Sequence, residues 1–168
     1  MKAEHINPFI NSVSEVFKSM LNCDVKVGKV EISEPKDCDE EQYIIGMIGM
    51  SGTARGVISM KFPEETAKKA VGKFVGLEFE TVDSEVIDGI GELINIVAGN
   101  AKTKFQGHSI SLSLPTVVKG SVYKLKNLGK LVWLSVPFSS EVGSFSIEVS
   151  FKPVEDPVKE VENASVSR

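Results

Sequence analysis

Apolar residues recur at two different spacings along this chain, and the order of these spacings constrains the fold more than any other feature of the sequence. A spacing of three and four residues is typical of a helix with one buried face, and strict alternation is typical of a half-buried strand. The spacings occur in the order helix, three strands, two helices, three strands. This order predicts an α+β fold with helices layered on a mainly antiparallel sheet, in the sequence α-β-β-β-α-α-β-β-β.

The expected helices have recognisable ends. They are expected over residues 7–21, 63–76 and 83–107. The first begins at Asn7-Pro8, an N-cap amide followed by proline at the first helical position. Its apolar stripe consists of Phe9, Ile10, Val13, Val16, Phe17, Met20 and Leu21. The third helix is capped by Asp83 or Ser84 and buries Ile87, Ile90, Ile94, Val97, Ala101 and Phe105.

The expected strands are bounded by turn residues and prolines. They cover residues 25–32, 43–50, 54–62, 110–114, 131–138 and 144–152. The alternation of Ile110, Leu112 and Leu114 with serines predicts a half-buried strand that Pro115 stops. Pro137 is expected at a sheet edge or a strand end, because proline has no backbone N–H for the ladder.

A glycine-rich segment, 49–53, lies between two of these strands. One interpretation of this segment is a loop that binds a phosphate through its backbone. The segment lacks the order of glycines and lysine of a P-loop and no helix follows it, so a plain hairpin around Ser51-Gly52 is preferred.

The composition predicts one globular domain and excludes several classes of function. With 168 residues, 42% of them hydrophobic, the chain can bury one sizeable core. We expect a single domain over residues 1–154 and a disordered tail over 155–168, where no periodic apolar face is present. The net charge is -4 and the basic residues are scattered, so nucleic acid is not an expected partner.

Membrane insertion and metal binding are not expected either. No apolar run approaches the ~20 residues that span a bilayer, and the N-terminus has no secretion signal, so a cytoplasmic location is expected. Cys23 and Cys38 are too few and too far apart for a zinc motif or a disulfide framework. With His5 and His108 as its two histidines, the chain is not expected to bind a metal or cofactor of its own.

The segment 88–102 combines a helical apolar pattern with polar residues and glycines that the pattern does not require. Glu92 and Asn95 are three residues apart and so share a helix face, with Asp88 one turn earlier. Gly91 and Gly99 lie four residues either side of Asn95. Each glycine costs about 0.5–1 kcal/mol relative to alanine inside a helix, which indicates that another surface must approach closely. These five residues are the candidate site.

The E-x-x-N spacing alone is weak evidence, since it also occurs at 4–7 and at 160–163. The first of these matches falls where a helix is only beginning, and the second falls in the charged tail. The longer run from Glu92 to Lys102 resembles the signature helix of the CheC/CheX/FliY family of chemotaxis phosphatases, and within it that of CheX. The resemblance includes the segment 7–10, and the order of expected elements is compatible with it from about residue 7 to residue 153.

The resemblance implies a function and a partner. In this family the Glu and the Asn enter the active site of a phosphorylated CheY-like receiver, where they promote hydrolysis of its aspartyl phosphate. By resemblance, Asn95 positions the attacking water, Glu92 anchors the receiver through its conserved Lys, and Asp88, Gly91 and Gly99 belong to the partner-binding surface. The Mg²⁺ would then be bound by the receiver. The resemblance also implies a homodimer.

Two other hypotheses remain open. One is a non-catalytic module that binds phosphorylated receivers in a chemotaxis or flagellar assembly, against which the intact Glu92 and Asn95 pair argues. The other is a sensory domain with a small ligand between sheet and helices, which no convergent polar cluster supports. Without the resemblance, polar residues on the outer face of an amphipathic helix would be interpreted as simple solvation.

Overall fold

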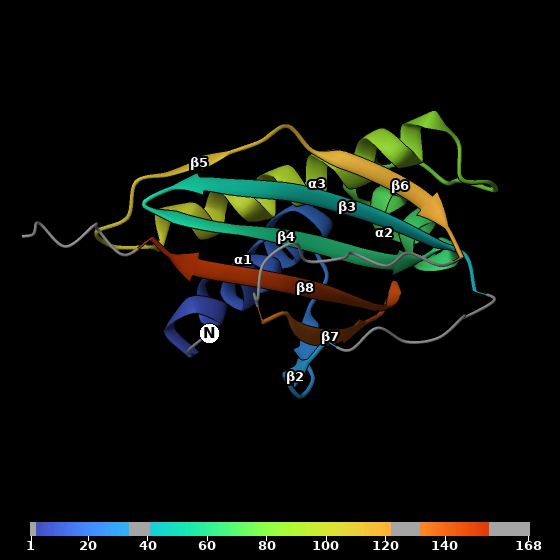
Figure 1. The fold of residues 1–168 in the computed structure, drawn as a ribbon. Coiled ribbons are helices and arrows are strands. Elements are labelled where there is room, and N and C mark those ends of the chain that lie inside the picture. The colour runs from blue at the N-terminus through green and yellow to red at the C-terminus, as the bar shows by residue number, and fades with distance from the viewer. Residues whose placement is uncertain (1–2, 34–40, 122–131, 155–168) are drawn as a thin grey trace, which may run out of the picture.

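The computed structural model describes residues 3–33, 41–121 and 132–154. The described part of the chain contains three helices and one eight-stranded antiparallel sheet (Figure 1). The helices are α1 (Ala3–Leu21), α2 (Glu64–Val75) and α3 (Ser84–Thr103). The strands are β1 (Val25–Val27), β2 (Glu31–Ile32), β3 (Tyr43–Gly52), β4 (Ala54–Pro63), β5 (Ile110–Leu112), β6 (Thr116–Gly120), β7 (Leu134–Ser140) and β8 (Gly143–Pro153). The predicted α+β fold class is confirmed.

The sheet has the order β1-β7-β8-β4-β3-β5, with β2 also paired to β7 and β6 also paired to β3. Strands β3 and β4 form the expected hairpin, in which Gly52 adopts a φ of 112° that favours glycine. The alternation in β8 places Phe145, Ile147, Val149 and Phe151 on the buried face. The core therefore lies on the face of the sheet that the helices cover (Figure 1).

Aromatic rings fill the space between α1 and the sheet. The Phe145 ring of β8 stacks on Phe17 of α1 at a centroid distance of 4.7 Å, and on Phe62 and Phe138 at 5.0 and 5.1 Å. Full burial of such a side chain contributes roughly 1.5–3 kcal/mol relative to exposure. This packing fixes α1 on the sheet.

Helix α1 begins earlier than predicted, and the prediction of a start at Asn7-Pro8 is wrong. Pro8 lies inside the helix, although it cannot donate a backbone hydrogen bond to the preceding turn. Extension of the helix upstream buries Ile6 on the same face as Phe9, and this burial offsets the lost bond. Met20 was predicted in the buried stripe but is 45% exposed.

The predicted strand over residues 25–32 is interrupted. Its two pieces, β1 and β2, both pair with β7, and the gap between them lies opposite Pro137. A Cβ built on Gly28 would lie 2.7 Å from Pro137 Cγ, so a residue with a side chain would crowd the proline ring at this position, while the backbone N–H of Gly28 donates to the carbonyl oxygen of Pro137 at 2.7 Å. Pro137 is therefore not at an edge or strand end as predicted: it sits within β7, and the neighbouring strand breaks instead.

A strand that was not predicted, β6, follows Pro115 and pairs with the first half of β3. Strand β5 pairs with the last residues of β3, so both strands run along the same side of β3. Leu114 lies between β5 and β6 and is 87% exposed, in contrast to the predicted buried position. The proline ended one strand as expected, but pairing resumed immediately after it.

The ends of the other two helices agree closely with the sequence. Helix α2 is preceded by Pro63 and closed by Gly76 in the left-handed region. Helix α3 is capped by Asp83 and ends at Thr103, four residues before the predicted end at Gly107. Among the described residues, no helix is long and apolar enough to cross a membrane.

Candidate functional site

Helix α3 is held tightly on the sheet. Asp83 Oδ1 accepts a hydrogen bond of 3.0 Å from the backbone N–H of Val86, which fixes the first turn. A Cβ built on Gly46 of β3 would lie 3.0 Å from Ile94 Cγ2 and 3.3 Å from Ile90 Cγ2. Glycine at this strand position lets the helix approach closely. The face of α3 that points away from the sheet is thereby fixed in position and orientation.

The polar residues of the motif lie on that opposite face. Asp88, Glu92 and Asn95 are all exposed, on consecutive turns of α3. Gly99 is half-buried and follows one turn after Asn95. We call these four residues the α3 ridge. A carboxylate and an amide therefore face solvent side by side from a rigid helix.

The two sides of α3 are in close contact with the rest of the molecule. On one side, a Cβ built on Gly89 would lie 2.5 Å from Val71 Cγ1 of α2. On the other side, a Cβ built on Gly91 would lie 3.4 Å from Val117 Cγ2 of β6. Gly91 is buried, and its immediate neighbours are residues of its own chain. The α3 ridge is thus framed by α2 and by β6.

Gly99 differs from both of these glycines. No atom outside the immediate backbone lies within 4 Å of a Cβ built at this position. The internal packing therefore does not require glycine at position 99. Open space beside the α3 ridge is what a close approach by another molecule would use.

Asn100, which follows the ridge, faces α1. Its side-chain amide donates a hydrogen bond of 2.9 Å to Glu15 Oε2, and Lys104 Nζ donates to both oxygens of the same carboxylate at 2.8 and 3.0 Å. No role for Asn100 was predicted from the sequence. The bond across to α1 becomes evident once the helix pair is seen in three dimensions, because the two residues are 85 positions apart.

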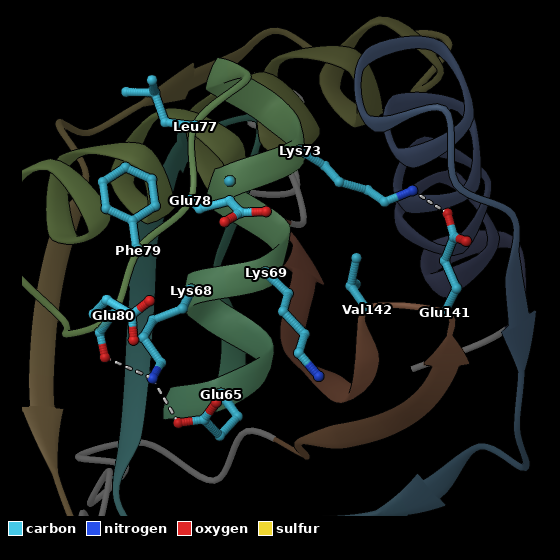
Figure 2. A pocket seen from close by; sticks show the side chains of 11 residues that line it. Glu65, Lys68, Lys69, Lys73, Leu77, Glu78, Phe79, Glu80, Glu141 and Val142 are labelled. Atoms are coloured by element: carbon cyan, nitrogen blue, oxygen red, sulfur yellow. Dashed lines mark hydrogen bonds and ion pairs between the residues drawn. The ribbon is translucent and has the colours of Figure 1, made fainter.

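A surface hollow lies elsewhere, between α2, the segment after it and the β7–β8 turn (Figure 2). It has a volume of about 480 Å³ and is lined mainly by charged side chains, including Glu65, Lys68, Lys69, Lys73, Glu80 and Glu141. Lys68 Nζ lies 2.6 Å from Glu65 Oε1, and Lys73 forms an ion pair with Glu141. These contacts lower the pKa of Glu65 and raise the pKa of Lys73. Much of the charge is mutually neutralised, and none of the ridge residues lines the hollow.

The second E-x-x-N match lacks a comparable setting. Glu4 and Asn7 are exposed in the first two turns of α1, and the match at 160–163 lies outside the described residues. Within 3–33, 41–121 and 132–154, no group of three or more His, Cys, Asp and Glu side chains is placed to hold a metal ion. The α3 ridge presents two carboxylates, Asp88 and Glu92, and the amide of Asn95 to a visiting molecule.

Comparisons with known proteins identify relatives of this chain. The family model described as chemotaxis phosphatase CheX matches residues 44–139, which include α3. The CheY-P phosphatase CheX of Thermotoga maritima is 31% identical over 155 residues, covering 90% of this chain and 98% of the relative. Both matches extend well beyond the motif.

Solved structures give the same result for the fold. A CheC-like superfamily protein from Shewanella has a TM-score of 0.80 at 32% identity and covers 90% of this chain and 99% of its own. The CheX–CheY–BeF₃–Mg²⁺ complex from Borrelia burgdorferi has a TM-score of 0.71 at 27% identity, with coverage of 90% and 98%. From the extent of these matches, the chain belongs to the CheX family of chemotaxis phosphatases, a family of hydrolases.

Proposed function

We propose that this protein hydrolyses the aspartyl phosphate of a CheY-like receiver and so terminates a chemotactic signal. The observation that carries this proposal is the joint exposure of Glu92 and Asn95 on one face of α3. Two relatives support the choice of substrate. The Thermotoga maritima relative is named as a CheY-P phosphatase, and the Borrelia burgdorferi relative forms a complex with CheY, BeF₃ and Mg²⁺.

Asn95 positions the attacking water in this proposal. Its side-chain carbonyl accepts a hydrogen bond from the water while its NH₂ group donates to the phosphoryl oxygens. Phosphoryl transfer needs little covalent help from a protein, because orientation of the nucleophile and stabilisation of charge supply most of the catalysis. An amide can therefore be catalytic without acting as a base.

Glu92 anchors the receiver. Its carboxylate pairs with a lysine of the receiver in a charge-assisted hydrogen bond, which fixes the helix in register over the phosphate. Glu92 is exposed on α3, where its side chain can reach a group on a partner. Anchoring is the role that an exposed carboxylate on a rigid helix fits best.

The rest of the α3 ridge forms the surface against which the receiver docks. Asp88 adds a second exposed carboxylate one turn before Glu92. Gly99 leaves room beside Asn95, and Gly91 lets β6 pack close behind the ridge. We include Gly91 in the partner-binding set because its contact with β6 determines how far the ridge projects toward the receiver.

The Mg²⁺ of the reaction is assigned to the receiver. The complex of the Borrelia burgdorferi relative with CheY, BeF₃ and Mg²⁺ supports this assignment. A receiver-bound Mg²⁺ would neutralise charge on the transferring phosphoryl group. The role of this chain is then confined to the water and to docking.

We propose further that residues 1–154 constitute the phosphatase domain, that it acts in the cytoplasm, and that it pairs as a homodimer. A feature at the β1–β2 edge of the sheet supports a second copy as a partner. Val27, Val30 and Ile32 are all exposed there, and Ile32 is 67% exposed. Burial of these side chains against a second copy would remove apolar surface from water.

The decisive experiment measures phosphate release from the phosphorylated CheY receiver of the same organism. Wild-type protein is expected to accelerate release, and Asn95→Ala to lose about 10²–10³-fold of the acceleration, as is typical when one preorganised hydrogen bond is removed from a transition state. Gln106→Ala, which removes an exposed amide beyond the end of α3, is the matched control. If the protein binds the receiver but the receiver loses its phosphate only at the spontaneous rate, the non-catalytic binding module would be favoured instead.

A further inference from the structure

The edge of the sheet beside α3 contains a β-bulge. Met50 pairs with Leu112 and Met47 pairs with Thr116. Two residues of β3 are therefore opposed by the three residues of the segment 113–115. A bulge of this kind redirects a side chain and is frequent beside active sites.

The bulge is held by specific hydrogen bonds. The backbone N–H of Ser113 donates to the carbonyl oxygen of Gly49 at 2.9 Å, and the backbone N–H of Gly49 donates to Ser113 Oγ at 2.9 Å. Ser113 Oγ in turn donates to the carbonyl oxygen of Leu114 at 2.9 Å. The segment is therefore a fixed projection of the sheet.

The bulge adjoins one side of the α3 ridge. A Cβ built on Gly91 would lie 3.9 Å from Pro115 Cγ and 3.4 Å from Val117 Cγ2. Gly91 directly precedes Glu92 and lies four residues before Asn95. In Figure 1 the connection from β5 to β6 runs beside α3. A partner that covers the ridge on this side thus meets the bulge next.

Leu114 is the side chain that the bulge turns outward. At 87%, it has the highest exposure of the large hydrophobic side chains in the described part of the chain. Burial of one leucine against a partner changes a dissociation constant by roughly 10–100-fold. Apolar anchors of this kind beside charged contacts are typical of protein interfaces.

We propose that Leu114 is an apolar anchor of the receiver-docking surface, and that it inserts against an apolar patch on the CheY-like receiver next to the phosphorylated aspartate. This inference rests on the proposed function, since the occupant is the same receiver. The ridge supplies polar contacts at the phosphate, and Leu114 supplies affinity without touching the reacting atoms. Leu114 is thus a partner-binding residue and not a catalytic one.

The test uses Leu114→Glu, with Leu77→Glu as the control, because Leu77 is also exposed but lies in the segment after α2. The probe is the CheY receiver of the same organism, loaded with beryllofluoride and Mg²⁺, and calorimetry measures its affinity. Leu114→Glu is expected to weaken binding at least about tenfold. The KM for the phosphorylated receiver should rise in parallel, with kcat unchanged. Leu77→Glu should match the wild type in both measurements.

Three outcomes would overturn the inference. The first is an affinity of Leu114→Glu for the receiver that equals that of the wild type, and the second is a fall in kcat at constant KM. The third is conversion of a wild-type dimer to a monomer by Leu114→Glu, which would assign the side chain to the contact with a second copy. Failure of the proposed function is distinguishable from these. If the wild type binds the beryllofluoride-loaded receiver without accelerating phosphate release, and Leu114→Glu still weakens binding, hydrolysis is refuted while the anchor is supported.

Discussion

The side-chain amide of Asn100 on α3 donates a hydrogen bond of 2.9 Å to Glu15 Oε2 on α1. Lys104, the residue that follows the end of α3, donates to the same carboxylate. The hydrogen bond from Lys104, followed by that from Asn100, lowers the pKa of the Glu15 carboxyl. These three residues join α1 to the C-terminal end of α3. Because the contact involves an ionised carboxylate, its contribution to the stability of the protein should depend on pH.

Glu15→Gln is expected to reduce stability at neutral pH and to have no effect at acid pH. A carboxyl whose pKa is lower in the folded protein contributes its stabilisation fully above the unfolded-state pKa, near 4.5, and loses it as the pH falls through the folded-state value. Because Glu15 is largely exposed, the loss at pH 7 should be at most about 1 kcal/mol. Urea unfolding of the variant and the wild type at pH 7 and pH 3 measures the difference in the free energy of unfolding.

Glu78→Gln provides the comparison for this measurement. Glu78 is exposed and forms no hydrogen bond or ion pair within the described residues. The Glu78→Gln substitution should leave the free energy of unfolding unchanged at both pH values. A loss of stability in Glu15→Gln that is equal at pH 7 and pH 3 would contradict a charge-dependent role.

Glu92→Gln tests the anchoring role. Hydrogen bonds to charged groups contribute about 1.5–3 kcal/mol, so the variant should raise the KM for the phosphorylated receiver by about 10–100-fold while kcat changes little. Steady-state phosphate release at several receiver concentrations separates the two constants. Glu78→Gln, at an exposed position in the segment after α2, is the control. A fall in kcat with loss of the acidic limb of the pH–rate profile would instead assign Glu92 as a general base.

Gly99→Ala should have opposite effects on stability and on activity. Alanine at this position meets no neighbour within 4 Å and should stabilise the protein by about 0.5–1 kcal/mol through helix propensity. If the open space is used for receiver docking, the same methyl group should raise the KM. Thermal unfolding and phosphate-release kinetics give the two quantities.

The contrast with Gly89→Ala makes the result specific to position 99. A methyl group at position 89 would lie 2.5 Å from Val71 Cγ1, so this variant should be destabilised by roughly 1–3 kcal/mol. A stabilised Gly99→Ala variant with wild-type kinetics would remove Gly99 from the docking surface.

Ile32→Lys tests the dimer. A lysine at this exposed edge position would place charges at an apolar contact between copies and should shift the protein toward the monomer. Sedimentation velocity over a range of concentrations measures the change. Leu77→Lys, which alters an exposed leucine away from the β1–β2 edge, should keep the wild-type mass. A dimer of unchanged stability in Ile32→Lys would exclude this edge.

The fold class could be predicted because the central strands and the helices have clean periodicity. Strands β3, β4 and β8 and helices α2 and α3 all occur close to their predicted bounds. Pro8 and Pro137 were misplaced for a common reason. Each was placed by the backbone hydrogen bond that proline cannot donate. In the folded protein, burial of Ile6 compensates for that loss at Pro8, and a break in the neighbouring strand accommodates Pro137.

The positions of the candidate site residues follow from local sequence, but their surroundings do not. Glu92 and Asn95 share a helix face because of their spacing alone, and the structure places both in solvent. Leu114 was misassigned because one extra residue opposite β3 reverses the alternation of side chains. The contact of Asn100 with Glu15 depends on how two helices cross, which no local pattern encodes.

The break between β1 and β2 has a consequence for how this sheet can meet other chains. The outer strands offer runs of three and two residues, separated where Gly28 passes Pro137. An incoming foreign strand would find no continuous row of free amide and carbonyl groups to extend, so open-ended polymerisation is blocked at this border. Assembly there must rely on side-chain complementarity, which favours a closed pair over a growing fibre.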